Sequence, residues 1–284
     1  MRRLQAMPRQ KTLMGILVLF LLAPHVVSAQ GTAESNGTNT LTFGVVPQQA
    51  ASKLARAWVP MLKNISDRSG LTVDFATAPD IPTFEERLAR GEYDIAYMNP
   101  YHFTLFNENP GYQALARARD HRIRGIIVVR RESGITSLSD LAGQALAFPA
   151  PRAFAATLVT RSHLETEAAG YTAHFVSSHD SVYRSVASGR FVAGGGIQRT
   201  LNALEAGVRE ELRVLWRSPG YTPHAIAVHP RVNEETRRTL LGALTGLEDS
   251  EAGLQILEPL RMKGFEAAAN ADWDDVRRLN ISAQ

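Results

Sequence analysis

The order of strand-like and helix-like patterns constrains the fold of this chain more than any other feature. From residue 41 to residue 98, short apolar stretches alternate with stretches whose apolar residues recur every three to four positions, as at Leu54, Trp58 and Met61. Gly70 follows the first helical stretch, where a glycine commonly ends a helix. This alternation predicts strands joined by crossover helices in a mostly parallel sheet.

The same alternation starts again near residue 124 and continues to about residue 220. Expected strands lie at 124–129, 145–148, 173–176 and 212–216, and expected helices lie at 154–164, 181–188 and 197–206. Two such series predict two α/β lobes, each with a central, mostly parallel sheet. We expect one lobe to comprise residues 41–129 and 222–284 and the other residues 130–221, joined by two hinge strands near Val129–Arg131 and Ser218–Thr222.

The first 29 residues have the organisation of a secretory signal peptide. A basic leader precedes the apolar run Leu13–Leu22, and small residues follow at Val27-Ser28-Ala29. A membrane anchor is the alternative, but the apolar run is shorter than the roughly 20 residues that a spanning helix needs. We therefore expect cleavage after Ala29, a disordered leader over residues 30–40, and a soluble periplasmic product.

Charge and cysteine content exclude some classes of partner. The formal net charge of the chain is +3, and the leader contains four basic residues and no acid, so its removal leaves −1. The basic character therefore belongs to the leader and does not indicate a nucleic-acid partner. The absence of cysteine excludes disulfides and a lipid-modified cysteine after the leader.

No sequence motif indicates catalysis. The chain lacks the glycine-flanked serine of hydrolases, the zinc-binding helix with paired histidines, and the glycine-rich nucleotide loops. Ser178-His179-Asp180 contains the residue types of a catalytic triad, but triad members come from separate segments, so three consecutive residues do not form one. The histidines also lack the spacing of metal ligands. We expect a protein that is not an enzyme and has no metal or cofactor.

Polar and aromatic side chains follow the strand expected at 93–98. Tyr97, Asn99 and Tyr101 lie at its carboxyl end, and Gln48 follows the first strand of the chain. Ligands of open α/β sheets bind outside the carboxyl ends of strands, so these four residues are predicted to form the wall of a ligand cleft. The alternative for Tyr97 is packing in the core, because side chains alternate along a strand.

A second candidate wall follows the strand that ends at Phe148. Two prolines fix a turn, and a helix is expected to begin near Ala153, with Arg152 at the turn and Phe154 and Thr157 in the first helical residues. Helix N-termini bind anions through unpaired N–H groups and the helix dipole, so the N–H groups of residues 153–156 are candidate anion ligands. An ordinary strand-to-helix connection is the alternative reading.

Two further strand ends converge on the same expected lobe. His179 opens a helix after the strand at 173–176, and as a single residue it is more often a capping or packing residue than a ligand. Gly195 lies in the run Ala193–Ile197, where glycines allow a backbone to approach a ligand closely. Both residues are therefore candidate members of the second wall.

Five stretches together resemble the substrate-binding proteins of phosphate, phosphite and phosphonate ABC transporters. They are F-G-V-V-P at 43–47, R-A-W-V-P at 56–60, G-E-Y-D-I-A-Y at 91–97, S-G-I-T-S-L-S-D-L-A-G at 133–143 and S-H-D-S-V at 178–182. The resemblance covers residues 41 to about 260 and implies the two-lobed type II periplasmic binding fold. It also assigns His179 to the family's ligand-site histidine.

The chain departs from the family at two ligand-binding positions. The Ser-Thr-Ser run that holds phosphoryl oxygens is replaced by Pro151–Thr157, which retains one hydroxyl at Thr157, and the Asp-Ala-Gly motif is replaced by Val192-Ala193-Gly194. The resemblance therefore implies the fold and the role of the family, and leaves the identity of the ligand open.

The resemblance implies a periplasmic solute-binding protein that captures a small, phosphate- or phosphonate-like oxyanion between two lobes. The partners expected from it are an anionic small molecule and an ABC permease in the inner membrane, and we expect a monomer. A ligand-sensing module for a membrane sensor kinase is the alternative, since the same fold serves both roles.

Overall fold

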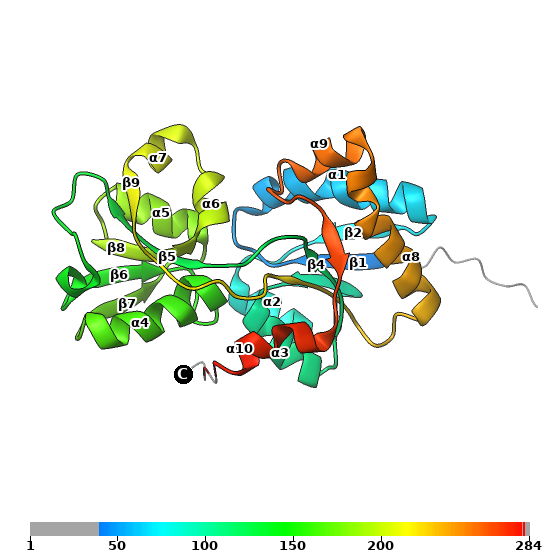
Figure 1. Ribbon diagram of the computed structural model, residues 1–284, viewed down its shortest axis with the longest axis horizontal. Coiled ribbons are helices and arrows are strands. Elements are labelled where there is room, and N and C mark those ends of the chain that lie inside the picture. The colour runs from blue at the N-terminus through cyan, green and yellow to red at the C-terminus, as the bar shows by residue number, and fades with distance from the viewer. Residues whose placement is uncertain (1–39, 280, 282–284) are drawn as a thin grey trace, which may run out of the picture. The chain divides into compact units, whose positions relative to one another are not determined.

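The computed structural model describes residues 40–279 and residue 281, which form two β-sheets with their helices (Figure 1). The signal peptide and most of the leader predicted from the sequence lie outside the described residues. Over the described part of the chain, no helix is both long and apolar enough to cross a membrane.

The first sheet has six strands in the order β11-β4-β10-β3-β1-β2. The strands are β1 (Leu41–Val45), β2 (Val73–Ala76), β3 (Ile95–Met98), β4 (Gln113–Ala118), β10 (Ala225–Val228) and β11 (Phe265–Ala267). β1 pairs in parallel with β2 and β3, whereas β10 is antiparallel to β3 and β4, and β11 is antiparallel to β4. The carboxyl ends of β1 and β3 therefore lie at one edge and deliver Gln48 and Asn99 there.

The helices associated with this sheet begin and end at residues suited to those positions. They are α1 (Ala51–Ser69), α2 (Ile81–Ala89), α3 (Pro100–Glu108), α8 (Glu234–Thr245), α9 (Glu251–Leu257) and α10 (Asp274–Arg277), with 3₁₀ turns at Leu247–Asp249 and Asn270–Trp273. Asp80 caps α2 by accepting the N–H of Thr83 at 2.8 Å. Gly70 ends α1 in the left-handed conformation, which glycine adopts without steric cost.

The second sheet has five strands in the order β7-β6-β8-β5-β9. The strands are β5 (Gly125–Arg130), β6 (Ala145–Phe148), β7 (Thr172–Phe175), β8 (Ala193–Ile197) and β9 (Leu212–Arg217). β6 is parallel to β7 and β8, and β5 is antiparallel to β8 and β9. The helical segments are Leu138–Leu141, η2 (Phe154–Val159), α4 (Thr160–Glu167), α5 (His179–Ala187), α6 (Gln198–Asn202) and α7 (Ala206–Glu210).

Both sheets are mixed, whereas the sequence predicted mostly parallel sheets. The antiparallel pairs include the strands next to the two segments that connect the sheets. β5, which enters the second sheet, is antiparallel to β9, which leaves it. β10, which re-enters the first sheet between β3 and β4, is antiparallel to both. The first crossing expected near Val129–Arg131 falls earlier, because β5 already pairs in the second sheet from Gly125 onward. An isolated bridge between Ile123 and Tyr221 marks where the two connecting segments run together.

The helix expected at 154–164 begins as a π-helix. The Ala153 carbonyl accepts the N–H of Thr157 at 2.7 Å and that of Leu158 at 3.2 Å, and the second bond spans five residues. The helix expected at 197–206 is interrupted and forms the two short helices α6 and α7.

The hydrophobic core of the first sheet extends to the start of η2. Its buried cluster includes Trp58, Tyr97 and Phe103 together with Phe154 and Ala155. Two smaller clusters fill the opposite faces of the second sheet. The beginning of η2 therefore packs against the first sheet, and this junction contains most of the residues that the sequence proposed for ligand binding.

Candidate functional site

Gln48 links the first sheet to three other segments at this junction. Its carbonyl oxygen accepts the N–H of His179 at 3.1 Å, and its Oε1 accepts Nη2 of Arg199 at 2.7 Å. Its Nε2 lies 3.0 Å from Nε2 of His224, at hydrogen-bond distance. Gln48 is buried, so these bonds form away from bulk water. The loop after β1 is thus held against α5, α6 and the segment before β10.

Tyr97 contributes an aromatic wall to the same junction. Its ring stacks on the ring of His224, with centroids 4.9 Å apart and 12° between the planes, and lies 4.5 Å from the ring of Trp58. The guanidinium carbon of Arg199 is 5.6 Å from the Tyr97 centroid, within cation–π range. Burial raises the pKa of Tyr97, so its phenol stays protonated at neutral pH. The ring is buried, as the core-packing alternative supposed, and also forms part of a cavity wall.

The two buried histidines at the junction are neutral. Burial, and secondarily the nearby Arg199 cation, lower the pKa of His179 to about 3. The same two causes lower the pKa of His224 well below its usual value. Nδ1 of His179 lies 3.2 Å from the Thr200 hydroxyl. The imidazoles therefore supply hydrogen-bonding groups, and Arg199 supplies the positive charge.

A small cavity of about 10 Å³ lies at the start of η2. Residues from both sheets line it, including the predicted Gln48, Asn99, Ala153, Phe154 and His179. This volume is about the space that one water molecule needs, so the walls are nearly in contact. The structure thus brings five of the ten predicted site residues to a single, nearly closed space.

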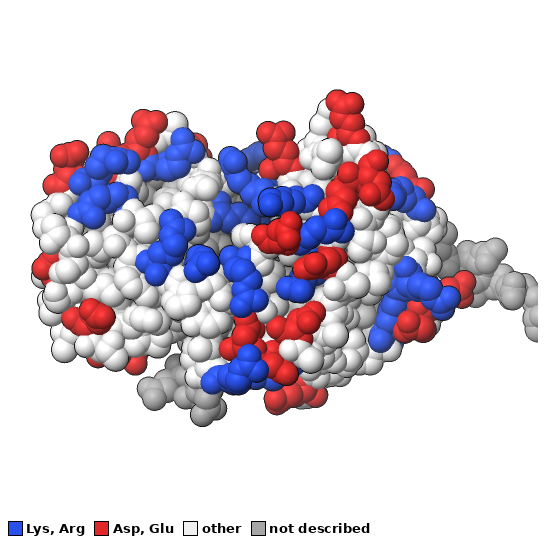
Figure 2. All heavy atoms as spheres, in the orientation of Figure 1, with Lys and Arg blue, Asp and Glu red and all other residues white. Residues whose placement is uncertain are grey.

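A larger cavity of about 250 Å³ adjoins the small one. His224, Ile123 and Ile197 line both cavities, while Tyr97 and Arg199 line the larger one. On the face drawn in Figure 2, basic side chains gather over the segments that cross between the two sheets. We call this space the arginine cavity, and its basic residues are Arg122, Arg124, Arg199, Arg217, Arg261 and His121.

Arg199 and His224 were not among the site residues predicted from the sequence. Arg199 belongs to the run A-G-G-G-I-Q-R-T at 193–200, whose last three residues follow the end of β8. The position of Arg199 after a strand end was the signal that the sequence offered. His224 precedes β10, which is antiparallel to β3. Its place beside Tyr97 depends on that strand order, which single-segment patterns do not reveal.

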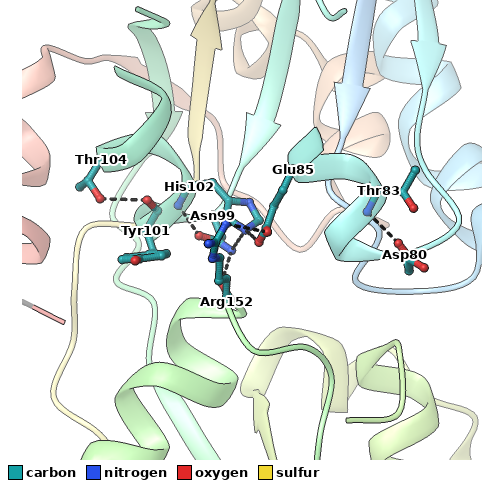
Figure 3. Close-up of polar contacts among 8 residues, drawn as sticks. All are labelled: Asp80, Thr83, Glu85, Asn99, Tyr101, His102, Thr104 and Arg152. Carbon is teal, nitrogen blue, oxygen red and sulfur yellow. Dashed lines mark hydrogen bonds and ion pairs between the residues drawn. The ribbon is translucent and has the colours of Figure 1, made fainter. Parts of the chain in front are cut away.

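Arg152 forms an ion pair instead of lining either cavity. Its Nη1 lies 3.3 Å from a carboxylate oxygen of Glu85, as Figure 3 shows. Asn99 accepts the N–H of His102 at 2.8 Å as the cap of α3, and its amide nitrogen donates to the Arg152 carbonyl at 3.1 Å. The Tyr101 ring is half-buried and packs against the first core cluster. Its carbonyl oxygen accepts the Thr104 hydroxyl at 2.8 Å.

Thr157 and Gly195, the remaining predicted residues, line neither cavity: Thr157 belongs to η2, and Gly195 belongs to β8. The Thr157 hydroxyl is buried and has no hydrogen-bond partner among the described residues. A Cβ added at Gly195 would lie 2.0 Å from the Ala156 carbonyl oxygen. The glycine therefore allows η2 to pack directly on β8, which is a structural reason for glycine at this position.

Over residues 40–279 and 281, no group of three or more His, Asp or Glu side chains is placed to hold a metal ion.

Solved structures of binding proteins share this architecture. A binding-protein component of an ABC phosphonate transporter from Pseudomonas aeruginosa superposes with a TM-score of 0.79 at 18% identity, covering 85% of each chain. The PhnD1 protein of Prochlorococcus marinus in complex with methylphosphonate gives a TM-score of 0.77 at 18% identity, covering 86% of this chain and 99% of that one. The fold is that of a two-lobed periplasmic binding protein, which confirms the predicted fold class.

Sequence comparison identifies the family within this class. The family described as "ABC transporter, phosphonate, periplasmic substrate-binding protein" matches residues 43–273, and the chain belongs to it, as the resemblance predicted. The phosphate-import protein PhnD of Mycolicibacterium smegmatis is 25% identical over 60% of this chain, and this chain spans 57% of that protein's length. The phosphonates-binding periplasmic protein of Escherichia coli is 21% identical over 85% of this chain and 76% of its own length.

Proposed function

We propose that this protein captures a small oxyanion, of the phosphate or phosphonate type, at the junction of its two sheets and delivers it to an ABC permease in the inner membrane. One observation carries the proposal: the Arg199 guanidinium lies at this junction, bound to Gln48 and the Tyr97 ring, and no acidic side chain of the described residues pairs with it. An anionic ligand would supply the missing negative charge.

The groups around Arg199 suit an oxyanion in different ways. The guanidinium offers a planar fork that bonds two oxygens of a phosphoryl group at once. His179 and His224 are neutral and donate one N–H each in the appropriate tautomer. The backbone N–H groups at the start of η2 and the Thr157 hydroxyl would supply further donors, as expected from the sequence.

Opening and closing of the two sheets would admit and then enclose the ligand. The small cavity holds too little space for a phosphoryl group while Gln48 is bonded to His179 and Arg199. Rotation about the connecting segments near Ile123 and Tyr221 would separate these residues, and the ligand would replace their mutual bonds on closure. The permease would then recognise the closed form.

The relatives narrow the class of ligand to be tested. One is named as a phosphate-import protein and the other as a phosphonates-binding protein, so phosphate and alkylphosphonates are the first candidates. We infer a monomer that is released into the periplasm after cleavage at Ala29 and has no enzymatic activity. The family is one of transport components, so the sensor-kinase alternative is not favoured.

A thermal-shift and calorimetric panel tests the proposal. Phosphate, phosphite, methylphosphonate and sulfate are titrated into the protein, and at least one phosphorus oxyanion is expected to raise the melting temperature. A ligand at 100 times its Kd adds about 2.7 kcal/mol of stability. Arg199→Gln should weaken that ligand about 10- to 100-fold, since a charged hydrogen bond contributes about 1.5–3 kcal/mol.

The exposed Arg209 provides the matched control, since its guanidinium bonds, within the described part of the chain, only to the Asn202 carbonyl. Arg209→Gln is expected to bind the ligand as the unaltered protein does. If no oxyanion in the panel binds, or if Arg199→Gln binds as tightly as Arg209→Gln, the proposal is wrong.

A further inference from the structure

The arginine cavity contains more positive charge than one oxyanion requires. Arg122 is neutralised by Asp275, whose carboxylate lies 2.8 Å from Nη2. Arg124, Arg199, Arg217 and Arg261 also line the cavity. No Asp or Glu side chain lines it, and none within the described part of the chain forms an ion pair with any of these four arginines.

Three of these arginines donate hydrogen bonds to neutral oxygen atoms. Arg124 donates to the Ser218 carbonyl at 3.2 Å, and Arg217 donates to Oε1 of Gln198 at 2.6 Å. Arg199 donates to Oε1 of Gln48 at 2.7 Å. These bonds hold the guanidinium groups in place without cancelling their charge. Several unneutralised cations around one space repel one another, and a bound anion would relieve that repulsion.

Besides its basic residues, the arginine cavity has a wall of aromatic and aliphatic side chains. Tyr97, His224, Ile123 and Ile197 are all buried and form an aromatic and aliphatic surface. Such a surface suits the carbon body of a ligand, whereas the arginines suit charged ends. A volume of about 250 Å³ exceeds what an isolated phosphate ion needs.

The arginine cavity also adjoins the proposed oxyanion site. His224, Ile123 and Ile197 form a shared wall between it and the small cavity at the start of η2. Arg199 lines the arginine cavity and bonds to Gln48, which lines the small cavity. A molecule held by its phosphoryl group at the small cavity would therefore extend past His224 toward Arg124 and Arg217.

We propose that the arginine cavity binds a second anionic group of the same ligand, so that the substrate class is a small organic phosphonate or phosphate bearing a carboxylate or a second phosphoryl group. This inference rests on the proposed function. The head group occupies the site at Arg199 and His179, the carbon chain lies against the Tyr97–His224 wall, and the distal anion bonds to Arg124, Arg217 and Arg261.

Matched pairs of probes test this assignment. Propylphosphonate and 3-phosphonopropionate have the same chain length and differ by a terminal methyl or carboxylate, and butylphosphonate and 4-phosphonobutyrate form a longer pair. Calorimetry should give at least about tenfold tighter binding for the carboxylate member of one pair, as expected for a charge-assisted bond to arginine. This ratio should fall as the salt concentration rises.

Variants then locate the group that recognises the distal charge. In the double variant Arg124→Gln/Arg217→Gln, the ratio between carboxylate and alkyl members should fall to about threefold or less, while in Arg209→Gln it should stay at the unaltered value. Reading a ratio removes any general effect of the substitutions on folding or closure.

The outcomes separate this inference from the proposed function. If the alkylphosphonates bind and their carboxylate partners bind no tighter, or if the gain survives in the double variant, the second-anion site is wrong and the oxyanion site stands. If no probe and no inorganic oxyanion binds, the proposed function is wrong, and this inference is overturned with it.

Discussion

The Arg152 guanidinium and the Glu85 carboxylate form an ion pair of 3.3 Å between the turn before η2 and helix α2 (Figure 3). The Arg152 side chain is 45% exposed, whereas that of Glu85 is 11% exposed. The other Glu85 oxygen lies 2.8 Å from Nε2 of His102, which is fully buried. One carboxylate therefore joins an exposed cation of the second-sheet part of the chain to the interior beside the first sheet.

Arg152→Ala tests whether this arginine is a closing contact or a ligand contact. An exposed ion pair contributes about 0–1 kcal/mol, so we expect the unfolding free energy and the ligand affinity to change little, the latter by at most about fivefold. Urea denaturation and calorimetry measure both quantities. A loss of affinity of tenfold or more with unchanged stability would restore Arg152 to the ligand site that the sequence indicated.

Glu85→Ala is the companion substitution and should behave differently. It removes the partner of Arg152 and one of the two groups at hydrogen-bond distance from Nε2 of the buried His102, so the unfolding free energy should fall by about 1–3 kcal/mol. The other group, the Asn99 amide nitrogen, remains at 2.9 Å. Equal stability of the Glu85 and Arg152 variants would show that the bond to His102 contributes nothing.

The fold was predictable because its signals are local. Helix periods, Gly70 and the strand ends at Phe148 and Met98 are properties of short segments, and they indicated two α/β series of strands and helices. The mixed order of the strands was not predictable in this way. The position of β10 between β3 and β4 arises from pairing between residues that are more than a hundred positions apart in the sequence. The pattern of a single short segment contains no information about such pairing.

The residues of the candidate site were likewise predictable only where the signal is local. Gln48, Asn99, Ala153, Phe154 and His179 follow strand ends, and the structure brings them around one small cavity. Arg199 and His224 reach the same junction through packing between the sheets, so their sequence context did not distinguish them from surface residues.

The stability of the protein should depend on pH through its buried histidines. Burial lowers the pKa of His179 to about 3, while an unfolded histidine titrates near 6.5. Below pH 6.5 His179 binds a proton in the unfolded state, whereas in the folded state it stays unprotonated down to about pH 3. The free energy of unfolding therefore falls as the pH falls through this window. One such residue costs about 2 kcal/mol at pH 5.

Urea denaturation at pH 5, 6 and 7 measures this effect. His179→Gln should remove about 2 kcal/mol of the loss between pH 7 and pH 5, because glutamine does not titrate. The exposed His174 gives the control, and His174→Gln should keep the full pH dependence. The same dependence in both variants would contradict a neutral, buried His179.

Gly195→Ala should destabilise the fold. The new Cβ would lie 2.0 Å from the Ala156 carbonyl oxygen and 2.7 Å from a ring carbon of Phe148, so η2 and β8 must separate. Overpacking of this kind costs about 1–3 kcal/mol. Thermal and urea denaturation should show the loss in Gly195→Ala and not in Gly134→Ala, whose added Cβ meets nothing within 4 Å. Unchanged stability with lost ligand binding would instead support the ligand approach proposed from the sequence.

Thr157 in η2 and Thr160 at the start of α4 give the most discriminating test of whether η2 contributes a hydroxyl to the ligand site. Both are fully buried, but the Thr160 hydroxyl donates to the Ala156 carbonyl at 2.8 Å, whereas the Thr157 hydroxyl has no partner among the described residues. Valine keeps the shape of threonine and removes the hydroxyl. An unsatisfied buried hydroxyl costs about 1–3 kcal/mol, while a satisfied one contributes about 1 kcal/mol.

Thr157→Val should therefore raise the unfolding free energy of the ligand-free protein by about 1 kcal/mol, and Thr160→Val should lower it by a similar amount. If the Thr157 hydroxyl serves the ligand, Thr157→Val should also weaken phosphate or alkylphosphonate binding about fivefold or more, so that this variant gains stability and loses affinity together. Urea denaturation and calorimetry on the same two proteins give both numbers. A Thr157→Val protein that is more stable and binds with full affinity would remove Thr157 from the ligand site, because its hydroxyl would then be a structural defect that the ligand does not use.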